Sequence, residues 1–273
     1  MGLARRGGAR AHGCPLPGAR AVISLRHQGF ELLRYSHAQE LARPCAHEVR
    51  TLRGHVVTGF QPIDHPWHTG LSVAVPDVSG VNLWGGPTYV AGEGYVERND
   101  HGLIRHDGWA SPPTDGEIVE DLSWLGPDGA TLATERRTMR VDQVDTATST
   151  WTLAFSFRVL AKTRLEIGSP ATHGRAGAGY GGLFLRASAS FADGTASTKD
   201  GPARNGVRAP WLVLAGSEAT ICFLPDPQAN EPWFVRTAEY PGVCAALAFR
   251  RPLVVPEGES LSRDYRLAFA DTL

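Results

Sequence analysis

The sequence lacks an excess of charge of either sign. Its 27 Lys and Arg residues against 28 Asp and Glu residues leave a formal net charge of -1 over 273 residues. Proteins that bind nucleic acid or anionic membranes mainly through charge carry a strongly basic surface. The composition therefore favours neither partner, and it suits an uncharged or weakly charged ligand such as a small carbohydrate.

Long hydrophobic runs and closely paired cysteines are also missing. No stretch approaches the roughly 20 apolar residues of a membrane-spanning helix, so we expect no membrane association. The four cysteines, Cys14, Cys45, Cys222 and Cys244, lack the close pairs of a zinc site. We predict reduced thiols in a cytoplasmic protein. A disulfide between Cys222 and Cys244 is the alternative.

The common catalytic templates are absent as well. The chain has no G-x-S-x-G elbow, P-loop or H-E-x-x-H motif. Gly177–Gly182 formally fits G-x-G-x-x-G, but the strand-like segment Leu183–Ser188 follows where a dinucleotide site requires a helix. We interpret these glycines as residues of a tight loop.

Alternation of apolar and polar residues dominates the chain and predicts β-strands. The predicted strands are Ala21–Leu33, Val56–Phe60, Leu71–Val75, Thr138–Val144, Thr150–Leu160, Leu183–Ser190, Trp211–Leu214, Ala219–Leu224, Val243–Phe249 and Ser260–Ala270. Many short strands without helical periodicity or a dividing linker are typical of one large all-β domain. We therefore predict a single antiparallel β-sandwich over residues 21–273, preceded by a flexible leader over residues 1–20.

Two histidines lie close together in Asp64-His65-Pro66-Trp67-His68-Thr69-Gly70. Pro66 and Gly70 disfavour a helix, so we expect an irregular turn on which both imidazoles converge. His65 and His68 are candidates for acid/base catalysis or for binding one divalent metal ion, the only cofactor that the sequence leaves open. Alternatively, the turn is structural and both rings bond to backbone.

Two further residues, His106 and Glu135, extend this candidate catalytic group, and Arg136 beside them is a candidate substrate-binding residue. His106 lies beside Asp107 and Trp109, and Glu135-Arg136 follows the turn at 127–129 on the returning strand of a hairpin. Glu135 would be a base or a ligand, and Arg136 would hold a hydroxyl or an anion. The alternatives are a packed histidine and an internal or solvated ion pair.

Candidate substrate-binding residues lie farther along the chain. Arg186 follows the glycine-rich loop, and a Pro-bearing loop carries Asn230, Trp233 and Arg236. Polar side chains beside an aromatic platform are typical of a sugar site, with the tryptophan stacking on the ring. A structural loop closed by a buried tryptophan is the alternative.

Together, these motifs resemble the PmoA-like family of unknown function over residues 21 to 271. The resemblance rests on Asp64–Leu71, Asn82–Gly85, Gly102–His106, Thr134–Arg136, Tyr180–Leu183 and Pro232–Arg236. Many relatives carry a His where this chain has Pro227, so any role of that position is not carried over. The family name suggests a methane oxygenase subunit, an integral membrane protein, and the lack of an apolar span marks it as a misnomer. The resemblance implies a supersandwich similar to galactose mutarotase and a role in bacterial sugar catabolism.

Three functional hypotheses follow. The first is a carbohydrate-active epimerase, hydrolase or lyase that acts on a sugar or an oxidised sugar through its histidines. The second is a non-catalytic carbohydrate-binding protein. The third is a metal-dependent oxygenase in which His65, His68 and Glu135 form a facial triad. The sequence leaves the substrate and the oligomeric state open.

Overall fold

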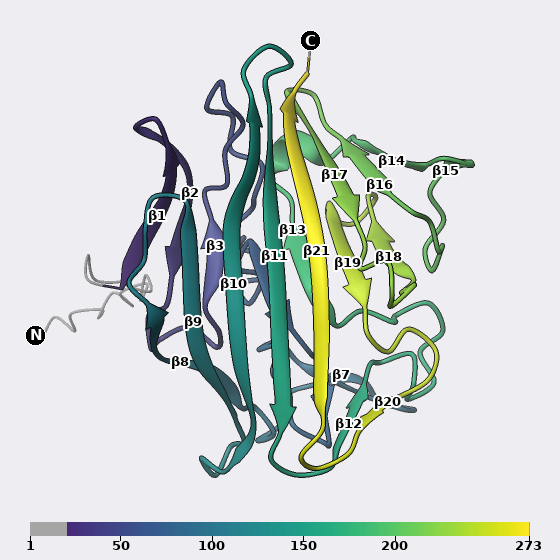
Figure 1. The fold of residues 1–273 in the computed structure, drawn as a ribbon. Coiled ribbons are helices and arrows are strands. Elements are labelled where there is room, and N and C mark those ends of the chain that lie inside the picture. Colours follow the sequence, from purple (N-terminus) through teal and green to yellow (C-terminus); the bar gives the residue numbers. More distant parts are fainter. Residues whose placement is uncertain (1–20, 273) are drawn as a thin grey trace, which may run out of the picture.

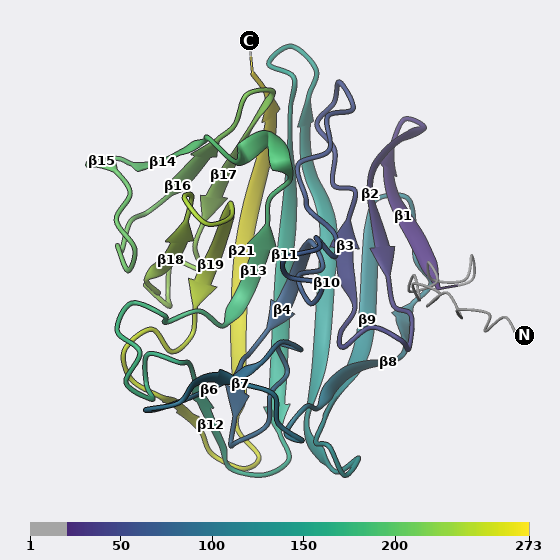
Figure 2. The same cartoon turned by 180° about the vertical axis from the view of Figure 1, so that it is seen from behind.

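The fold is built almost entirely of β-strands (Figures 1 and 2). The computed structural model describes residues 21–272, so the predicted leader over residues 1–20 lies outside the described residues. One short 3-10 helix, Ala189–Phe191, interrupts the strands. No helix in the described range has the length and apolar character needed to cross a membrane.

Two large antiparallel sheets pack face to face. The first has seven strands in the order β1 (Val22–His27), β2 (Phe30–Ser36), β3 (Cys45–His47), β4 (Leu71–Ala74), β13 (Gly182–Arg186), β19 (Gly242–Ala246) and β18 (Trp233–Arg236). The second has nine strands in the order β15 (Gly201–Pro202), β14 (Thr195–Thr198), β16 (Leu212–Ala215), β17 (Ala219–Leu224), β21 (Ser260–Asp271), β11 (Thr150–Ala161), β10 (Thr131–Asp145), β9 (Glu117–Leu125) and β8 (Leu103–Ser111). The nine-stranded sheet faces the viewer in Figure 1, and the seven-stranded sheet does so in Figure 2.

Smaller elements lie at one end of the sandwich. A three-stranded sheet has the order β20 (Leu253–Val255), β12 (Leu165–Gly168) and β5 (Asp77–Val78). Strands β6 (Thr88–Val90) and β7 (Gly94–Val96) form a separate hairpin. In Figure 2 this hairpin crosses in front of the sandwich at its lower end, near β12.

The main hydrophobic core lies between the two large sheets and includes Leu183, Leu185, Val243, Leu153 and Phe155. Because successive strand residues point to opposite faces, each strand contributes every second side chain to this core. The predicted all-β antiparallel sandwich is therefore confirmed.

A second apolar cluster covers the other face of the seven-stranded sheet. Phe184 of β13, Phe234 of β18 and Cys244 of β19 belong to it, and their immediate neighbours in sequence belong to the main core. We call it the outer cluster; its buried members are Ala74, Trp84, Phe184, Phe234, Tyr240, Cys244, Ala246 and Phe249. It gives the sheet an apolar outer face on which loops build a pocket.

The strand predictions are confirmed best for the long central strands, such as β11, β17 and β21. The segment Ala21–Leu33 is two strands rather than one, because Gln28 and Gly29 take positive φ angles and turn the chain. The prediction of a strand over Val56–Phe60 is wrong, since this segment makes isolated bridges to three separate parts of the chain. Cys222 and Cys244 are free thiols, which contradicts the alternative of a disulfide between them.

Candidate functional site

The two-histidine motif forms a pair of consecutive tight turns. The backbone N–H of His65 donates to the carbonyl of Pro62 at 3.0 Å, and that of His68 donates to the carbonyl of His65 at 2.9 Å. Gly70 then takes a φ of +77°, and a side chain there would meet the carbonyl oxygen of Ala46 at 2.4 Å. The motif therefore adopts the predicted irregular turn leading into β4, and Gly70 lets it lie close against β3.

The turn stacks the two imidazoles on each other. The ring centroids of His65 and His68 are 4.7 Å apart with an interplanar angle of 14°. The ring of Phe184 lies 5.0 Å from His68 and that of Tyr240 lies 5.1 Å from it, both in edge-on geometry. The turn therefore brings the two rings side by side, but it stacks them instead of directing both at one point.

The tautomer of His68 follows from its partner. The guanidinium Nη1 of Arg186 lies 3.2 Å from His68 Nδ1, and an arginine can only donate a hydrogen bond. Nδ1 must therefore accept, which places the proton of a neutral ring on Nε2. Burial, followed by the charges of His65 and Arg186, lowers the His68 pKa to about 2. His68 is consequently a neutral ring that presents an Nε2–H donor.

His65 has the opposite arrangement. Its Nδ1 lies 2.7 Å from Asp64 Oδ2, and the hydrogen bond to His65 holds the pKa of this carboxyl below its usual range. A carboxylate can only accept, so Nδ1 carries the proton and Nε2 of the neutral ring is an acceptor. Arg186 Nη2 lies 3.5 Å from the same Asp64 oxygen. One Asp–Arg pair therefore fixes an acceptor ring and a donor ring side by side.

Both imidazoles line a pocket of about 270 Å³, which we call the histidine pocket. Its other lining residues are Trp67, Trp84, Pro87, Tyr95, Arg175, Tyr180, Phe234, Arg236, Glu239 and Tyr240. Buried Arg43 fixes two of its walls, since its guanidinium donates to the carbonyls of Trp84 at 2.6 Å and Trp67 at 2.8 Å. The pocket is thus an aromatic enclosure with a small number of polar groups.

Positive charge exceeds negative charge among the pocket-lining side chains. Arg175 donates to the hydroxyl of Tyr95 and has no carboxylate partner within residues 21–272. Arg236 pairs with exposed Glu239 at 3.2 Å, but its Nε is buried without a hydrogen-bond partner in the described chain. A buried donor without a partner is costly, so Arg236 favours a ligand with an anionic group that can accept from it. The charge of Arg175 favours the same kind of ligand.

Two predicted catalytic residues do not line the histidine pocket. Glu135 is buried on β10, where it accepts from Trp124 Nε1 at 2.7 Å and from Arg137 Nε at 2.7 Å. His106 on β8 lies with its Nδ1 2.8 Å from buried Glu120. Both therefore belong to a polar network within the sandwich, and the expectation that they share one pocket with the histidine pair is corrected.

Three predicted substrate-binding residues also lie elsewhere. Arg136 is exposed and paired with Asp121 at 2.9 and 3.0 Å. Asn230 lines a separate pocket, and Trp233 is buried in the main core with its Nε1 3.4 Å from the carbonyl of Ala209. Of the five predicted residues, Arg236 lines the histidine pocket, and Arg186 lies behind it.

The residue pair does not fit a resident metal ion. A metal bound to imidazole lies in the ring plane at about 2.0–2.1 Å from nitrogen, and two nearly parallel stacked rings cannot both point at one ion. Both Nδ1 atoms are already engaged with Asp64 and Arg186. Among residues 21–272, no three His, Cys, Asp or Glu side chains are grouped as metal ligands. The predicted metal role of His65 and His68 is therefore corrected.

Strand alternation explains which residues were misassigned and which were missed. Trp233 and Arg236 lie on opposite faces of β18, and the residue that shares the outer face with Arg236 is Phe234. On β13 the same rule places Phe184 with Arg186. Applying this period to the short strands would have selected Phe234 from sequence, but Tyr95, Arg175 and Tyr240 come from loops or the separate hairpin, where no period exists.

Comparisons with known proteins give a family without an assigned function. The model of the family of unknown function DUF6807 matches residues 22–273, whereas no curated protein matches the sequence. Solved structures with a similar fold include a galactose 1-epimerase from Lactobacillus acidophilus NCFM, with a TM-score of 0.45 and 7% identity, covering 92% of this chain and 98% of that one. An alpha-galactosidase from Lactobacillus brevis gives a TM-score of 0.44 and 9% identity, covering 94% of this chain and 40% of that one.

Similarities at this level carry no information about a shared activity. The sequence resemblance to a family of unknown function is confirmed at that level, and the name PmoA-like remains a prediction. Because the family model spans nearly the whole chain, the protein belongs to the family of unknown function DUF6807.

Proposed function

We propose that the protein is a carbohydrate-active enzyme that transfers protons on an oxidised sugar, as an epimerase or a lyase. The observation that carries this proposal is the pair of opposite tautomers, an acceptor at His65 Nε2 beside a donor at His68 Nε2. Proton transfer at carbon needs a base and, close to it, a group that stabilises the developing negative charge. The histidine pocket supplies both.

The two histidines and the two arginines of the pocket have the main roles in this chemistry. His65 Nε2 removes the proton from the carbon next to the carboxylate of the sugar acid. Negative charge then moves onto the carboxylate oxygens, where Arg175, Arg236 and the neutral Nε2–H of His68 stabilise it. Delivery of a solvent proton to the opposite face, with release of the first proton from His65 to solvent, gives the epimer. In a lyase the bond to the neighbouring oxygen substituent breaks as the carbon–carbon double bond forms, and His65 passes its proton to the departing oxygen. His68 acts as a hydrogen-bond donor throughout, because its low pKa keeps the ring neutral.

Hydrolysis of a glycosidic bond fits the pocket less well. Most glycosidases place two carboxylates on either side of the scissile bond. Among the described residues that line the histidine pocket, Glu239 is the single carboxylate, and it is paired with Arg236. Epimerase or lyase chemistry is therefore the better match.

The aromatic lining supports a sugar as the substrate. The side chains of Trp67, Trp84 and Tyr240 offer apolar faces of the kind that pack on the C–H face of a sugar ring, while the arginines would bind its charged end. Small-molecule sites commonly combine such an apolar lining with a few fixed polar groups. A cytoplasmic location remains a prediction from the sequence.

The proposal is tested by proton NMR in D₂O with a panel of monomeric uronates and aldonates. We expect at least one substrate to exchange a carbon-bound proton for deuterium or to gain a vinylic proton. His65→Gln and His68→Asn should each lower that rate at least about 100-fold, the lower range of general acid–base contributions. His27→Asn, which alters a histidine on β1 outside the pocket, is the matched control and should be unchanged.

Two results would contradict the enzyme proposal. Exchange that persists in both pocket variants would show that these histidines are not the catalytic pair. Binding of a panel sugar without any turnover would instead support the non-catalytic carbohydrate-binding alternative.

A further inference from the structure

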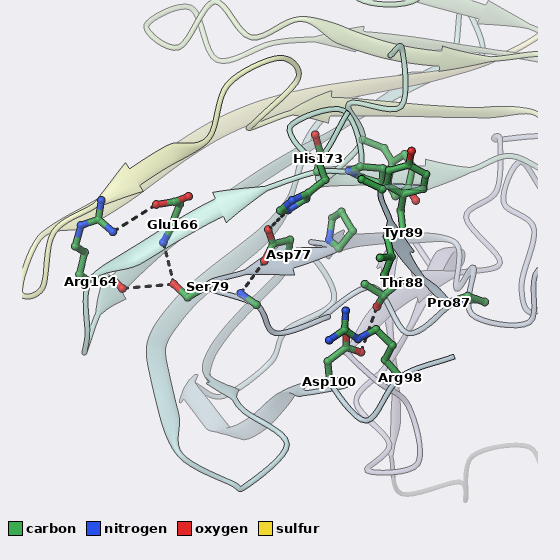
Figure 3. Close-up of a pocket in the computed structure, with 17 residues that line it drawn as sticks. Asp77, Ser79, Pro87, Thr88, Tyr89, Arg98, Asp100, Arg164, Glu166 and His173 are labelled. Atoms are coloured by element: carbon green, nitrogen blue, oxygen red, sulfur yellow. Dashed lines mark hydrogen bonds and ion pairs between the residues drawn. The ribbon is translucent and has the colours of Figure 1, made fainter. Parts of the chain in front are cut away.

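A second, larger pocket adjoins the histidine pocket. Its volume is about 550 Å³, roughly twice that of its neighbour. We call it the adjoining pocket, and Figure 3 shows its lining side chains. Its polar members are Asp77, Ser79, Thr88, Tyr89, Arg98, Asp100, Arg164, Glu166, Ser169 and His173. Nothing in the proposed chemistry of the histidines uses these residues.

The two pockets share walls. Pro87 and Tyr180 line both of them. The β6–β7 hairpin contributes Tyr89 to the adjoining pocket and Tyr95 to the histidine pocket, and these cross-strand partners have ring centroids 5.6 Å apart. The loop between β12 and β13 places Tyr180 beside Tyr95, with their hydroxyls 2.9 Å apart. The pockets therefore lie next to each other along one surface formed by the same two segments.

Charge differs between the two pockets. In the adjoining pocket both arginines have a carboxylate partner, Arg98 with Asp100 at 3.7 Å and Arg164 with Glu166 at 3.5 Å. The remaining carboxylate, Asp77, lies 2.7 Å from His173 Nε2, so no arginine charge is left without a partner. Figure 3 shows the Asp77–His173 and Arg164–Glu166 contacts within the pocket.

Compensated ion pairs suit a ligand that is rich in hydroxyls but carries no charge. Each pair offers donors and acceptors side by side, while a ligand charge of either sign would compete with an existing partner. The histidine pocket instead has Arg175 without a carboxylate partner in the described chain. One ligand that satisfies both pockets is anionic at one end and neutral at the other.

We propose that the two pockets are neighbouring subsites for an acidic oligosaccharide. The sugar acid occupies the histidine pocket, and an uncharged sugar linked to it occupies the adjoining pocket, with the linkage beside Tyr180 and Pro87. This inference rests on the proposed function, because it assigns the rest of the same substrate.

Binding measured by calorimetry tests the inference with defined probes. The monomeric probes are gluconate and glucuronate, and the longer ones are lactobionate, a galactosyl-gluconate, and a glucuronosyl-xylose. The two comparisons are lactobionate with gluconate and glucuronosyl-xylose with glucuronate. In at least one of them the longer probe should bind at least about tenfold more tightly, which is the effect of one added charge-assisted hydrogen bond. Arg98→Ala should remove that gain and leave the affinity for the monomer within about twofold.

Matched variants separate the possible outcomes. Arg98 is an exposed side chain, so its truncation should not disturb folding; Arg158→Ala on β11, also exposed, serves as the control and should leave all affinities unchanged. Equal affinity for the monomeric and longer probes, or an equal loss for both in Arg98→Ala, would overturn the inference and leave the proposed function standing. Failure of every acidic probe to bind would overturn both.

Discussion

The burial of His68 predicts a specific loss of stability at acidic pH. In the unfolded chain a histidine has a pKa of about 6.5, whereas in the folded protein burial, the nearby His65 and the guanidinium of Arg186 lower the His68 pKa to about 2. Between these values the unfolded chain binds a proton that the folded protein does not. The contribution of His68 to stability must therefore be complete above pH 6.5 and fall as the pH drops below it.

The size of this loss follows from the unfolded-state pKa alone, as long as the folded pKa is well below 5. A pH of 5 lies about 1.5 units below the pKa of His68 in the unfolded chain, and each unit changes the free energy of unfolding by about 1.4 kcal/mol. His68 should therefore lower the free energy of unfolding by about 2 kcal/mol between pH 8 and pH 5. Asp64 opposes the shift, but its own pKa is held low, so its charge is constant over this range.

The assay compares wild type with His68→Asn by urea unfolding at pH 8 and pH 5, followed by tryptophan fluorescence. The asparagine Oδ1 can accept from Arg186 but cannot titrate, so the variant should lose about 2 kcal/mol less than wild type over this interval. Other buried histidines contribute equally to both proteins and cancel. His27→Asn should behave as wild type. An equal loss of stability in wild type and His68→Asn would refute the assignment of His68 as a buried neutral ring.

Three other predictions concern the fold. Gly70→Ala should lower the free energy of unfolding by about 1–3 kcal/mol, because Gly70 has a positive φ and a side chain there meets a carbonyl of β3; unchanged urea unfolding would contradict this. Glu135→Gln should lower the free energy of unfolding by about 3 kcal/mol, because it removes the negative charge of the carboxylate nearest to buried Arg137, and a stability equal to wild type would show that the ion pair contributes little. Burial raises the pKa of Cys45 to about 11 and that of Cys244 to about 12, so iodoacetamide followed by peptide mass spectrometry should label them after unfolding and not in the native protein.

The fold was largely predictable from sequence because long central strands carry a strong period-two signal. Strands β11 and β21 are paired on both sides and buried on one face, so alternation marks them clearly. The edge of this sheet was harder to predict. Strand β8 has a neighbour on one side only, and its register against β9 is irregular. Neither β8 nor β9 was predicted from the sequence. The turn at His65 and His68 was recognised because Pro66 excludes the helical alternative.

The candidate site was predictable only where its residues lie close together in sequence. His65 and His68 share one turn, so their proximity follows from local geometry. The grouping of Glu135 with them failed because it required knowing which sheet and which face each strand occupies, and β10 directs Glu135 into the core towards Arg137. Tertiary pairing of distant segments also explains why Arg175 was not recognised.

The central claim is that two neighbouring neutral imidazoles hold opposite tautomers. Nitrogen-15 NMR of histidine-labelled protein tests it directly, with signals assigned by His65→Gln and His68→Asn. We predict that His68 keeps a protonated Nε2 and a bare Nδ1 from pH 8 down to pH 4, and that His65 at pH 8 shows the reverse pattern. A His68 ring that gains a second proton near pH 6, or that carries its proton on Nδ1, would contradict the account.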